Sequence, residues 1–174
     1  MARIRLEKTL RGHILDIGGG GECMMGRVYG AQTVAIDVDA QELAEAPVVC
    51  EKRVMDARSL DFPDGCFDHV TAFYALLYMD AEGQRRAIAE AARVLRTGGS
   101  LCIWDTETAD GEPPYLAELD VDAAGQTIRV SYGVIKDDAG QTMERTVRLC
   151  EEAGLHVVQA ERMEKQFFVR AVCV

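Results

Sequence analysis

Long apolar runs are absent from this chain of 174 residues. A helix that crosses a membrane needs about 18 or more consecutive apolar residues, and no stretch of the sequence approaches that length. The first residues carry charge but no apolar segment follows them, so we expect no signal peptide. These absences predict that the protein has no membrane association and is cytoplasmic.

Basic residues are fewer than acidic residues in this sequence. The sequence has 19 Lys and Arg residues against 29 Asp and Glu residues, which gives a net charge of −10. A protein that binds nucleic acid needs a basic face to neutralise phosphates. The acidic balance therefore argues against a nucleic-acid partner and favours a small molecule.

Closely spaced cysteine pairs and histidine clusters are also missing. None of the six cysteines forms a Cys-x-x-Cys motif, and the three histidines lie far apart in the sequence. Zinc sites are usually built from such closely spaced residues. We therefore expect no metal site. A chain long enough to bury a proper core does not need disulfides, so we also expect the cysteines to be reduced.

Five short apolar segments alternate with helix-like stretches in the first part of the chain, and each predicts a buried strand. Continuous apolar segments, rather than alternating ones, are typical of a parallel sheet that is covered on both faces. The clearest helix is predicted over Ala81–Leu95, where apolar residues recur at helical spacing up to a Thr-Gly-Gly exit. The predicted strands are 13–17, 33–37, 53–56, 67–73 and 100–105.

The later part of the chain has a different pattern. Apolar and polar residues alternate over 115–134 on both sides of a short polar break, which predicts an antiparallel β-hairpin with one exposed face. A helix is predicted over 143–154. Two strands then follow at 155–160 and 167–174, and the last has no helix before it, so we expect it to be antiparallel.

These elements together predict an α/β fold. We expect one domain over residues 1–174 that contains a Rossmann-like, doubly wound sheet of about seven strands, mostly parallel, with an antiparallel last strand. A loop and the hairpin are inserted at about 106–140, after the fifth strand.

Glycines follow the first predicted strand directly. The run Gly18–Gly21 lets the backbone turn sharply and approach a ligand closely. A dinucleotide site would need a glycine at position 23 and no negative charge beside the pyrophosphate, whereas Cys23 and Glu22 stand there. A plain strand-to-helix turn remains an alternative for this run taken alone.

Acidic residues end the next two predicted strands. Asp37 lies 19 residues after Gly18, and Asp56 lies 19 residues after Asp37. An acid at the first position can accept hydrogen bonds from both hydroxyls of a ribose, and an acid at the second can accept them from an adenine amine. Either acid alone is equally typical of a helix or turn cap. Together with the glycine turn they predict one nucleoside site at the carboxyl edge of the sheet.

Several segments resemble the motifs of the class I S-adenosylmethionine-dependent methyltransferases, in the family's order. The first segment has Glu22 where the family usually has its last glycine, and the fourth has Thr97 where proline is common. The resemblance covers most of the chain outside the inserted region and implies that the protein is a small, single-domain member. The segments are Leu15–Glu22, Val34–Asp37, Asp56–Asp68, Glu90–Leu101 and Glu151–Leu155.

The resemblance implies S-adenosylmethionine as the cofactor and S-adenosylhomocysteine as its product. It places the methionine part at the glycine turn, the ribose at Asp37 and the adenine at Asp56 and the backbone of Ala57, with Val38 packed on the ring. The cofactor's amino group would meet the backbone carbonyl of Phe73. The implied cofactor site is Asp16, Gly18, Gly19, Gly20, Asp37, Val38, Asp56, Ala57 and Phe73.

The implied reaction is transfer of a methyl group by in-line displacement to an unidentified acceptor, for which the acidic charge favours a small molecule. A methyl group on a sulfonium is already electrophilic, so the protein has to position the acceptor and exclude water. A base is needed only if the acceptor arrives protonated. The candidates for it are Tyr74, Tyr78 and Asp105, whereas Asp80 is equally typical of a helix cap.

Two other functions remain open at this point. One is a cofactor-binding module that has lost catalysis and serves as a partner or regulatory subunit. The other is a nicotinamide-dependent oxidoreductase, which the glycine turn disfavours. The hairpin would contact the acceptor, extend the edge of the sheet or join two copies of the chain, so both a monomer and a homodimer are compatible with the sequence.

Overall fold

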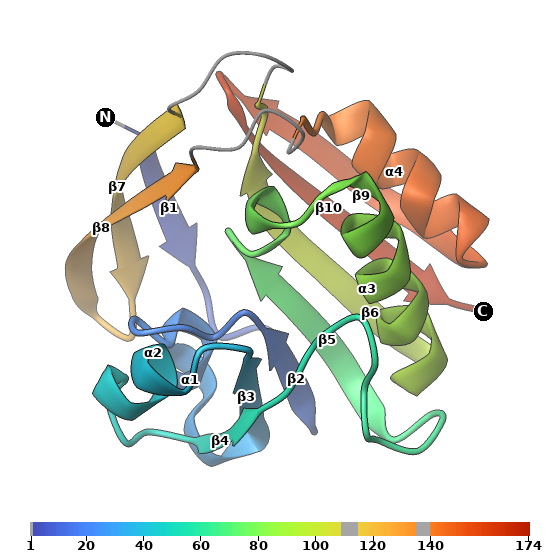
Figure 1. Cartoon of the computed structure of the whole chain (residues 1–174), viewed down its shortest axis with the longest axis horizontal. Coiled ribbons are helices and arrows are strands. Elements are labelled where there is room, and N and C mark those ends of the chain that lie inside the picture. Colours follow the sequence, from blue (N-terminus) through green and yellow to red (C-terminus); the bar gives the residue numbers. More distant parts are fainter. Residues whose placement is uncertain (1, 109–114, 135–139) are drawn as a thin grey trace.

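The computed structural model describes residues 2–108, 115–134 and 140–174 (Figure 1). In these residues the strands form two sheets, one of seven strands and one of three. Parts of the predicted loop and of the turn that closes the hairpin, residues 109–114 and 135–139, lie outside the described residues.

The larger sheet has the strand order β4-β3-β2-β5-β6-β10-β9. Its first five strands are parallel to their neighbours, and β10 is antiparallel to both β6 and β9. The prediction of a mostly parallel seven-stranded sheet with an antiparallel last strand is therefore confirmed. The strands are β2 (Ile14–Ile17), β3 (Thr33–Asp37), β4 (Glu51–Val54), β5 (Phe67–Phe73), β6 (Leu95–Thr106), β9 (Leu155–Met163) and β10 (Gln166–Cys173).

Helices cover this sheet on both faces, as its continuous apolar strands require. The helix α3 begins where the Asp80 carboxylate accepts a hydrogen bond from the backbone N–H of Gly83 at 2.7 Å. The helices α3 and α4 pack on one face of the large sheet, and α1 packs on the other face. None of the helices in the described stretches is both long and apolar enough to cross a membrane. The helices are α1 (Met24–Tyr29), α2 (Ala40–Glu45), α3 (Ala81–Val94) and α4 (Met143–Glu152), with short 3₁₀ turns η1 (Gly30–Gln32) and η2 (Leu76–Tyr78).

The smaller sheet contains the predicted hairpin. Strands β7 (Tyr115–Ala123) and β8 (Gln126–Val134) are antiparallel, as expected. The hairpin does not extend the edge of the large sheet, so that alternative is wrong. It pairs instead with β1 (Ala2–Leu6), which runs parallel to β7. Figure 1 shows the three strands standing beside the large sheet, above α1.

The strand β1 was not predicted, since we expected the first strand at 13–17. Its described buried apolar residues are Ile4 and Leu6, and its partner lies more than a hundred residues later in the chain. Both side chains are buried against α1 and the inner face of the hairpin. A short strand of this kind becomes recognisable only through its partner.

Several strand boundaries also differ from the prediction, and β9, for example, continues to Met163 instead of ending at 160. The strand β6 begins at Leu95 rather than at Ser100, because Leu95 already pairs with Phe67 before the register shifts. The strand β4 ends at Val54, two residues earlier than expected. Met55 nevertheless donates its backbone N–H to the Asp37 carbonyl at 2.9 Å, so the next residue, Asp56, still stands beside the end of β3.

Candidate functional site

A cavity of about 1090 Å³ opens at the carboxyl ends of the parallel strands β2, β3, β4 and β5, and β8 forms part of its wall. Parallel strands leave their connecting loops at this edge, which is where open α/β sheets bind ligands. All the predicted cofactor residues line this one cavity. They are Asp16, Gly18, Gly19, Gly20, Asp37, Val38, Asp56, Ala57 and Phe73.

The glycine turn after β2 forms one wall of the cavity. Gly18 has a φ of +68°, and a Cβ at this position would lie 2.5 Å from the Cβ of Ala75. Only glycine therefore fits here. The turn is held against β3 by a hydrogen bond in which the backbone N–H of Gly19 donates to the Ile36 carbonyl at 2.9 Å.

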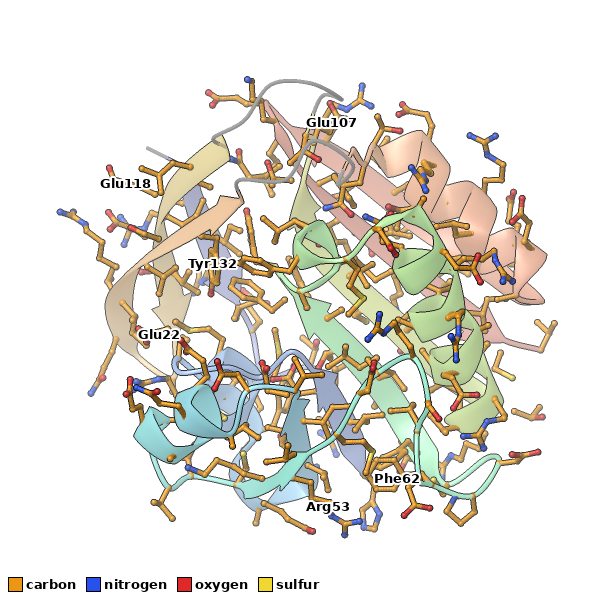
Figure 2. All side chains as sticks on the ribbon, viewed as in Figure 1. Glu22, Arg53, Phe62, Glu107, Glu118 and Tyr132 are labelled. Carbon is orange, nitrogen blue, oxygen red and sulfur yellow. The ribbon has the colours of Figure 1, made fainter. Side chains whose placement is uncertain are left out.

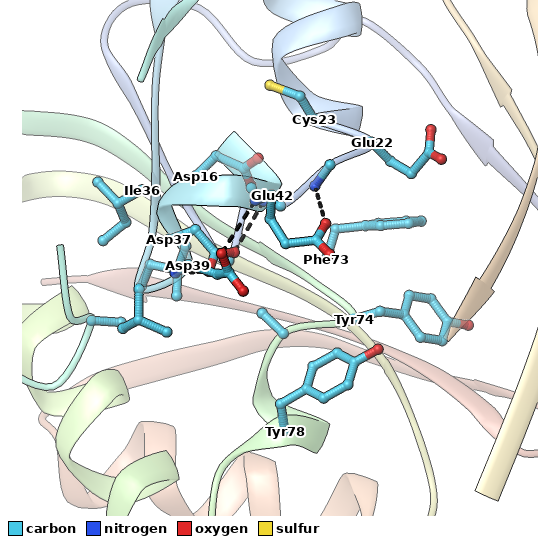
Figure 3. A pocket seen from close by; sticks show the side chains of 18 of the residues that line it. Asp16, Glu22, Cys23, Ile36, Asp37, Asp39, Glu42, Phe73, Tyr74 and Tyr78 are labelled. Carbon is cyan, nitrogen blue, oxygen red and sulfur yellow. Dashed lines mark hydrogen bonds between the residues drawn. The ribbon is translucent and has the colours of Figure 1, made fainter. Parts of the chain in front are cut away.

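Two carboxylates bind the backbone of the same turn. The Asp37 Oδ2 accepts from the N–H of Gly20 at 3.1 Å, and the Glu42 Oε2 accepts from the N–H of Gly21 at 2.9 Å. The other oxygen of Asp37 accepts from the N–H of Asp39 at 3.0 Å. Figure 3 shows these carboxylates gathered on one side of the cavity. Asp37 is thus fixed at the end of β3, where a ribose acceptor is expected.

The segment after β4 supplies the next part of the wall. The Arg58 guanidinium forms an ion pair with the Asp56 carboxylate, in which Nη2 donates a hydrogen bond to Oδ2 at 2.7 Å. Their hydrogen bond holds the pKa of Asp56 below its usual value, so this carboxyl is ionised at neutral pH. Ala57 is buried beside it, whereas Val38, which also lines the cavity, is 66% exposed and presents an apolar surface.

Asp16 lies at the base of the cavity and is buried. Its Oδ1 accepts a hydrogen bond from the Thr71 hydroxyl at 2.8 Å. Burial raises the pKa of Asp16 to about 7, because a buried carboxylate loses its hydration. In the described ranges, no group of three His, Cys, Asp or Glu side chains converges as a metal site.

Aromatic side chains form another part of the wall. The rings of Tyr74 and Tyr132 stack with their centres 4.7 Å apart, and Phe73 lies 6.1 Å from Tyr132. The hydroxyl of Tyr78 accepts a hydrogen bond from the backbone N–H of Gly133 at 3.3 Å. Figure 2 shows Tyr132 between β8 and the loop after β5. The hairpin is therefore joined to that loop beside the cavity.

The three candidate bases have different positions. Tyr74 and Tyr78 line the cavity, but Asp105 is not among the lining residues. Asp105 is fully buried near the end of β6, where its Oδ2 accepts from the N–H groups of Leu76 and Leu77 at 3.1 and 3.3 Å. Burial raises its pKa to about 7. Asp80 lines the cavity and also caps α3.

Several lining residues were not predicted from the sequence. Ser131 and Tyr132 come from the hairpin, and Glu42 comes from α2. Tyr132 continues the inward positions of the alternating pattern, which indicates the buried face but not what that face meets. No local pattern distinguishes Glu42, because its contact with the glycine turn depends on where α2 packs.

A methyltransferase domain family matches residues 15–103 of this chain, slightly more than half of its length. The chain belongs to the class I S-adenosylmethionine-dependent methyltransferases. Among solved structures, a methyltransferase of this class from Methanosarcina mazei superposes with a TM-score of 0.66 at 20% identity and covers 95% of this chain and 94% of the other. This likeness supports the fold.

Curated relatives match a shorter part of the chain. The O-methyltransferase resE of Aspergillus sclerotiorum is 32% identical over 113 residues, which are 58% of this chain and 42% of the relative. The phosphatidylethanolamine N-methyltransferase of Cereibacter sphaeroides is 33% identical over 112 residues, which are 59% of this chain and 54% of the relative. The aligned region thus spans about half the length of these relatives.

The lining residues fit the cofactor that the family implies. Eight acidic residues line the cavity against two basic ones, Arg27 and Arg58, and Arg58 is already paired with Asp56. Such a negative lining favours a cationic sulfonium and opposes a pyrophosphate. The turn at Gly18, where a Cβ would clash, gives a ligand close access to the backbone.

Proposed function

We propose that this protein binds S-adenosylmethionine in the cavity and transfers its methyl group to a small-molecule acceptor. The observation that carries the proposal is the arrangement of the glycine turn, Asp37 and Asp56 around one acid-lined cavity. Asp37 would hold the ribose, Asp56 and Ala57 the adenine, and the turn at Gly18 the methionine part. When bound, the cofactor supplies an electrophilic methyl group on sulfur, which an acceptor takes up by in-line displacement.

The acceptor would enter on the aromatic side of the cavity. Tyr78 and Tyr132 lie there, Ser131 is close to them, and the bond between Tyr78 and Gly133 joins the two elements that carry them. Rings at this position exclude water and orient a bound acceptor. The relatives named as O- and N-methyltransferases support methyl transfer but do not distinguish between oxygen and nitrogen acceptors.

We assign a supporting role to Asp105 rather than the role of a base. Its carboxylate holds η2, which carries Tyr78, and it lies outside the cavity lining. A base that acts on an acceptor has to reach the proton it removes. Tyr74 and Tyr78, which both line the cavity, remain the candidates if the acceptor arrives protonated.

The experiment that tests this proposal is calorimetric titration with S-adenosylhomocysteine, S-adenosylmethionine and NADH. We expect micromolar binding of the first two and none of NADH. Asp37→Ala removes an acceptor for charged hydrogen bonds, so its affinity for S-adenosylhomocysteine should fall by about tenfold or more. Asp61→Ala, at an exposed acid outside the cavity, serves as the control.

The outcomes separate the open alternatives. Binding of NADH alone would overturn the proposal and favour an oxidoreductase. Binding of the methyl donor should be followed by a panel of amine, phenol and carboxylate acceptors with labelled methyl groups. Cofactor binding with no transfer to any acceptor class would favour a regulatory module instead.

A further inference from the structure

Two thiols lie against each other directly behind the glycine turn. The Sγ atoms of Cys23 and Cys50 are 3.4 Å apart, although the residues are 27 positions apart in the sequence. Both cysteines are reduced. Cys23 is fully buried at the start of α1, and Cys50 is partly exposed just before β4. Figure 3 shows the Cys23 side chain pointing away from the carboxylates of Asp37 and Glu42.

The surroundings of the pair are built from small residues. A Cβ on Gly26 would lie 2.5 Å from the Cys23 sulfur and 2.7 Å from the Cys50 sulfur, so the two sulfurs occupy space that any side chain at Gly26 would fill. Ala35 and Ala46 complete this small cluster. A disulfide needs the sulfurs at about 2.05 Å, and small neighbours let them approach.

The chemistry of the two thiols differs in a way that suits oxidation. The hydrogen bond with Cys23 lowers the pKa of Cys50 to about 7, and a backbone hydrogen bond with Ala35 and the charge of Lys52 act in the same direction. The same hydrogen bond and burial raise the pKa of Cys23. Cys50 therefore supplies a thiolate that is partly exposed, which is the form that reacts with peroxides.

We propose that Cys23 and Cys50 are a reversible thiol–disulfide pair that weakens cofactor binding when it is oxidised. The Cys50 thiolate attacks hydrogen peroxide, the O–O bond breaks, and Cys50 becomes a sulfenic acid while hydroxide leaves and takes a proton. The Cys23 sulfur then attacks the sulfenic sulfur, the S–S bond forms, and water leaves. Two thiols are oxidised and one peroxide is reduced to two waters. A thiol reductant such as glutathione reverses the change.

The pair is coupled to the cavity through the backbone. Cys23 lines the cavity and donates its N–H to the Gly19 carbonyl at 2.9 Å, while its own φ of 47° is already in the left-handed region. The segment that leads to Cys50 begins at Pro47, which also lines the cavity. Forming the disulfide therefore draws the segment that begins at Pro47 toward the glycine turn, and both of these line the cavity. This step rests on the proposed function.

The test begins with the reduced full chain and hydrogen peroxide. Intact mass and peptide mapping should show loss of two hydrogens and a link between the peptides of Cys23 and Cys50. Calorimetry with S-adenosylhomocysteine should then show affinity about fivefold or more weaker for the oxidised protein, with full recovery after dithiothreitol. A disulfide between other cysteines, no disulfide, or a disulfide that leaves the affinity unchanged would each overturn the proposal.

Matched variants separate this result from other failures. Cys50→Ser should bind S-adenosylhomocysteine like the reduced wild type and become insensitive to peroxide. Cys66→Ser, at another partly exposed cysteine, should keep the full response. Persistent peroxide sensitivity in Cys50→Ser would overturn the proposal. Reduced wild-type protein that fails to bind the ligand would count against the proposed function instead.

Discussion

Single residues determine the shape of the cavity, and Gly18 is the strictest of them. Its positive φ strains any other residue by about 1–2 kcal/mol, and its Cβ would lie 2.5 Å from the Cβ of Ala75, an overlap that costs about 1–3 kcal/mol more. We therefore expect Gly18→Ala to lower the free energy of unfolding by about 2–5 kcal/mol. Urea titration measures this loss.

A second glycine isolates the steric part of that loss. Gly125 in the hairpin turn also has a positive φ, of +80°, but nothing lies within 4 Å of its would-be Cβ. Gly125→Ala should therefore cost only the strain, about 1–2 kcal/mol. Equal losses in the two variants would show that Ala75 gives way and that the turn is not closely packed.

At the residue scale, the sequence brought together the residues proposed to hold the cofactor, whereas it did not single out those proposed to meet the acceptor. Gly18, Asp37 and Asp56 stand at or just after the ends of their strands, so strand order alone brings them to one edge. Asp105 also ends a strand, but its side chain turns into the core beneath η2. Tyr132 reaches the cavity only because the hairpin packs there, which depends on contacts between distant parts of the chain.

The element scale shows why Asp105 matters. It is the buried acceptor for two N–H groups of η2, those of Leu76 and Leu77. Asp105→Ala would leave both groups without this acceptor, and we expect a loss of about 2–4 kcal/mol of unfolding free energy. Asp80→Ala, which removes only the cap of α3, should cost about 1 kcal/mol. Unchanged stability in Asp105→Ala would contradict the supporting role and reopen its candidacy as a base.

The strand β1 makes a second prediction at this scale. Ile4 is buried between the small sheet and α1, so Ile4→Ala should lower the free energy of unfolding by about 2–4 kcal/mol. The neighbouring Arg5 is exposed, and Arg5→Ala should change the free energy of unfolding by less than about 0.5 kcal/mol. Thermal unfolding of the two variants compares them directly. Similar small effects would mean that β1 does not form this sheet in solution.

The helices and strands that could be predicted are those whose sequence pattern lies within the element itself. The strands β3 and β5 begin and end where the apolar segments do, because both faces of each strand are buried. The start of β6 was missed because Leu95 looks like the end of a helix. Its pairing with Phe67 cannot be recognised from the residues next to it in the sequence. The same limit hid β1, which pairs with β7 in the described part of the chain.

The whole molecule combines a net charge of −10 with two buried carboxyls whose pKa values are about 7, Asp16 and Asp105. In the unfolded chain both would titrate near 3.8. The fold therefore holds protons on them that the unfolded chain releases. Repulsion among the remaining acids also grows as pH rises. Both effects lower the stability of the fold as pH rises toward 7, whereas Asp56 and Glu90, whose pKa values are lowered, favour the fold once ionised.

The free energy of unfolding should consequently fall as pH rises from about 4 to about 7 and level off above that range. Each pKa unit is worth about 1.4 kcal/mol, so a single carboxyl raised from 3.8 to about 7 contributes up to about 4 kcal/mol of this fall. Asp105→Asn removes the contribution of this carboxyl and should flatten the dependence of the unfolding free energy on pH. Asp61→Asn, at an exposed acid, should leave that dependence unchanged. Urea titrations across this pH range measure both slopes. A wild-type profile that rises toward pH 7 would contradict the account, because it would mean that the two buried carboxyls are ionised in the folded protein.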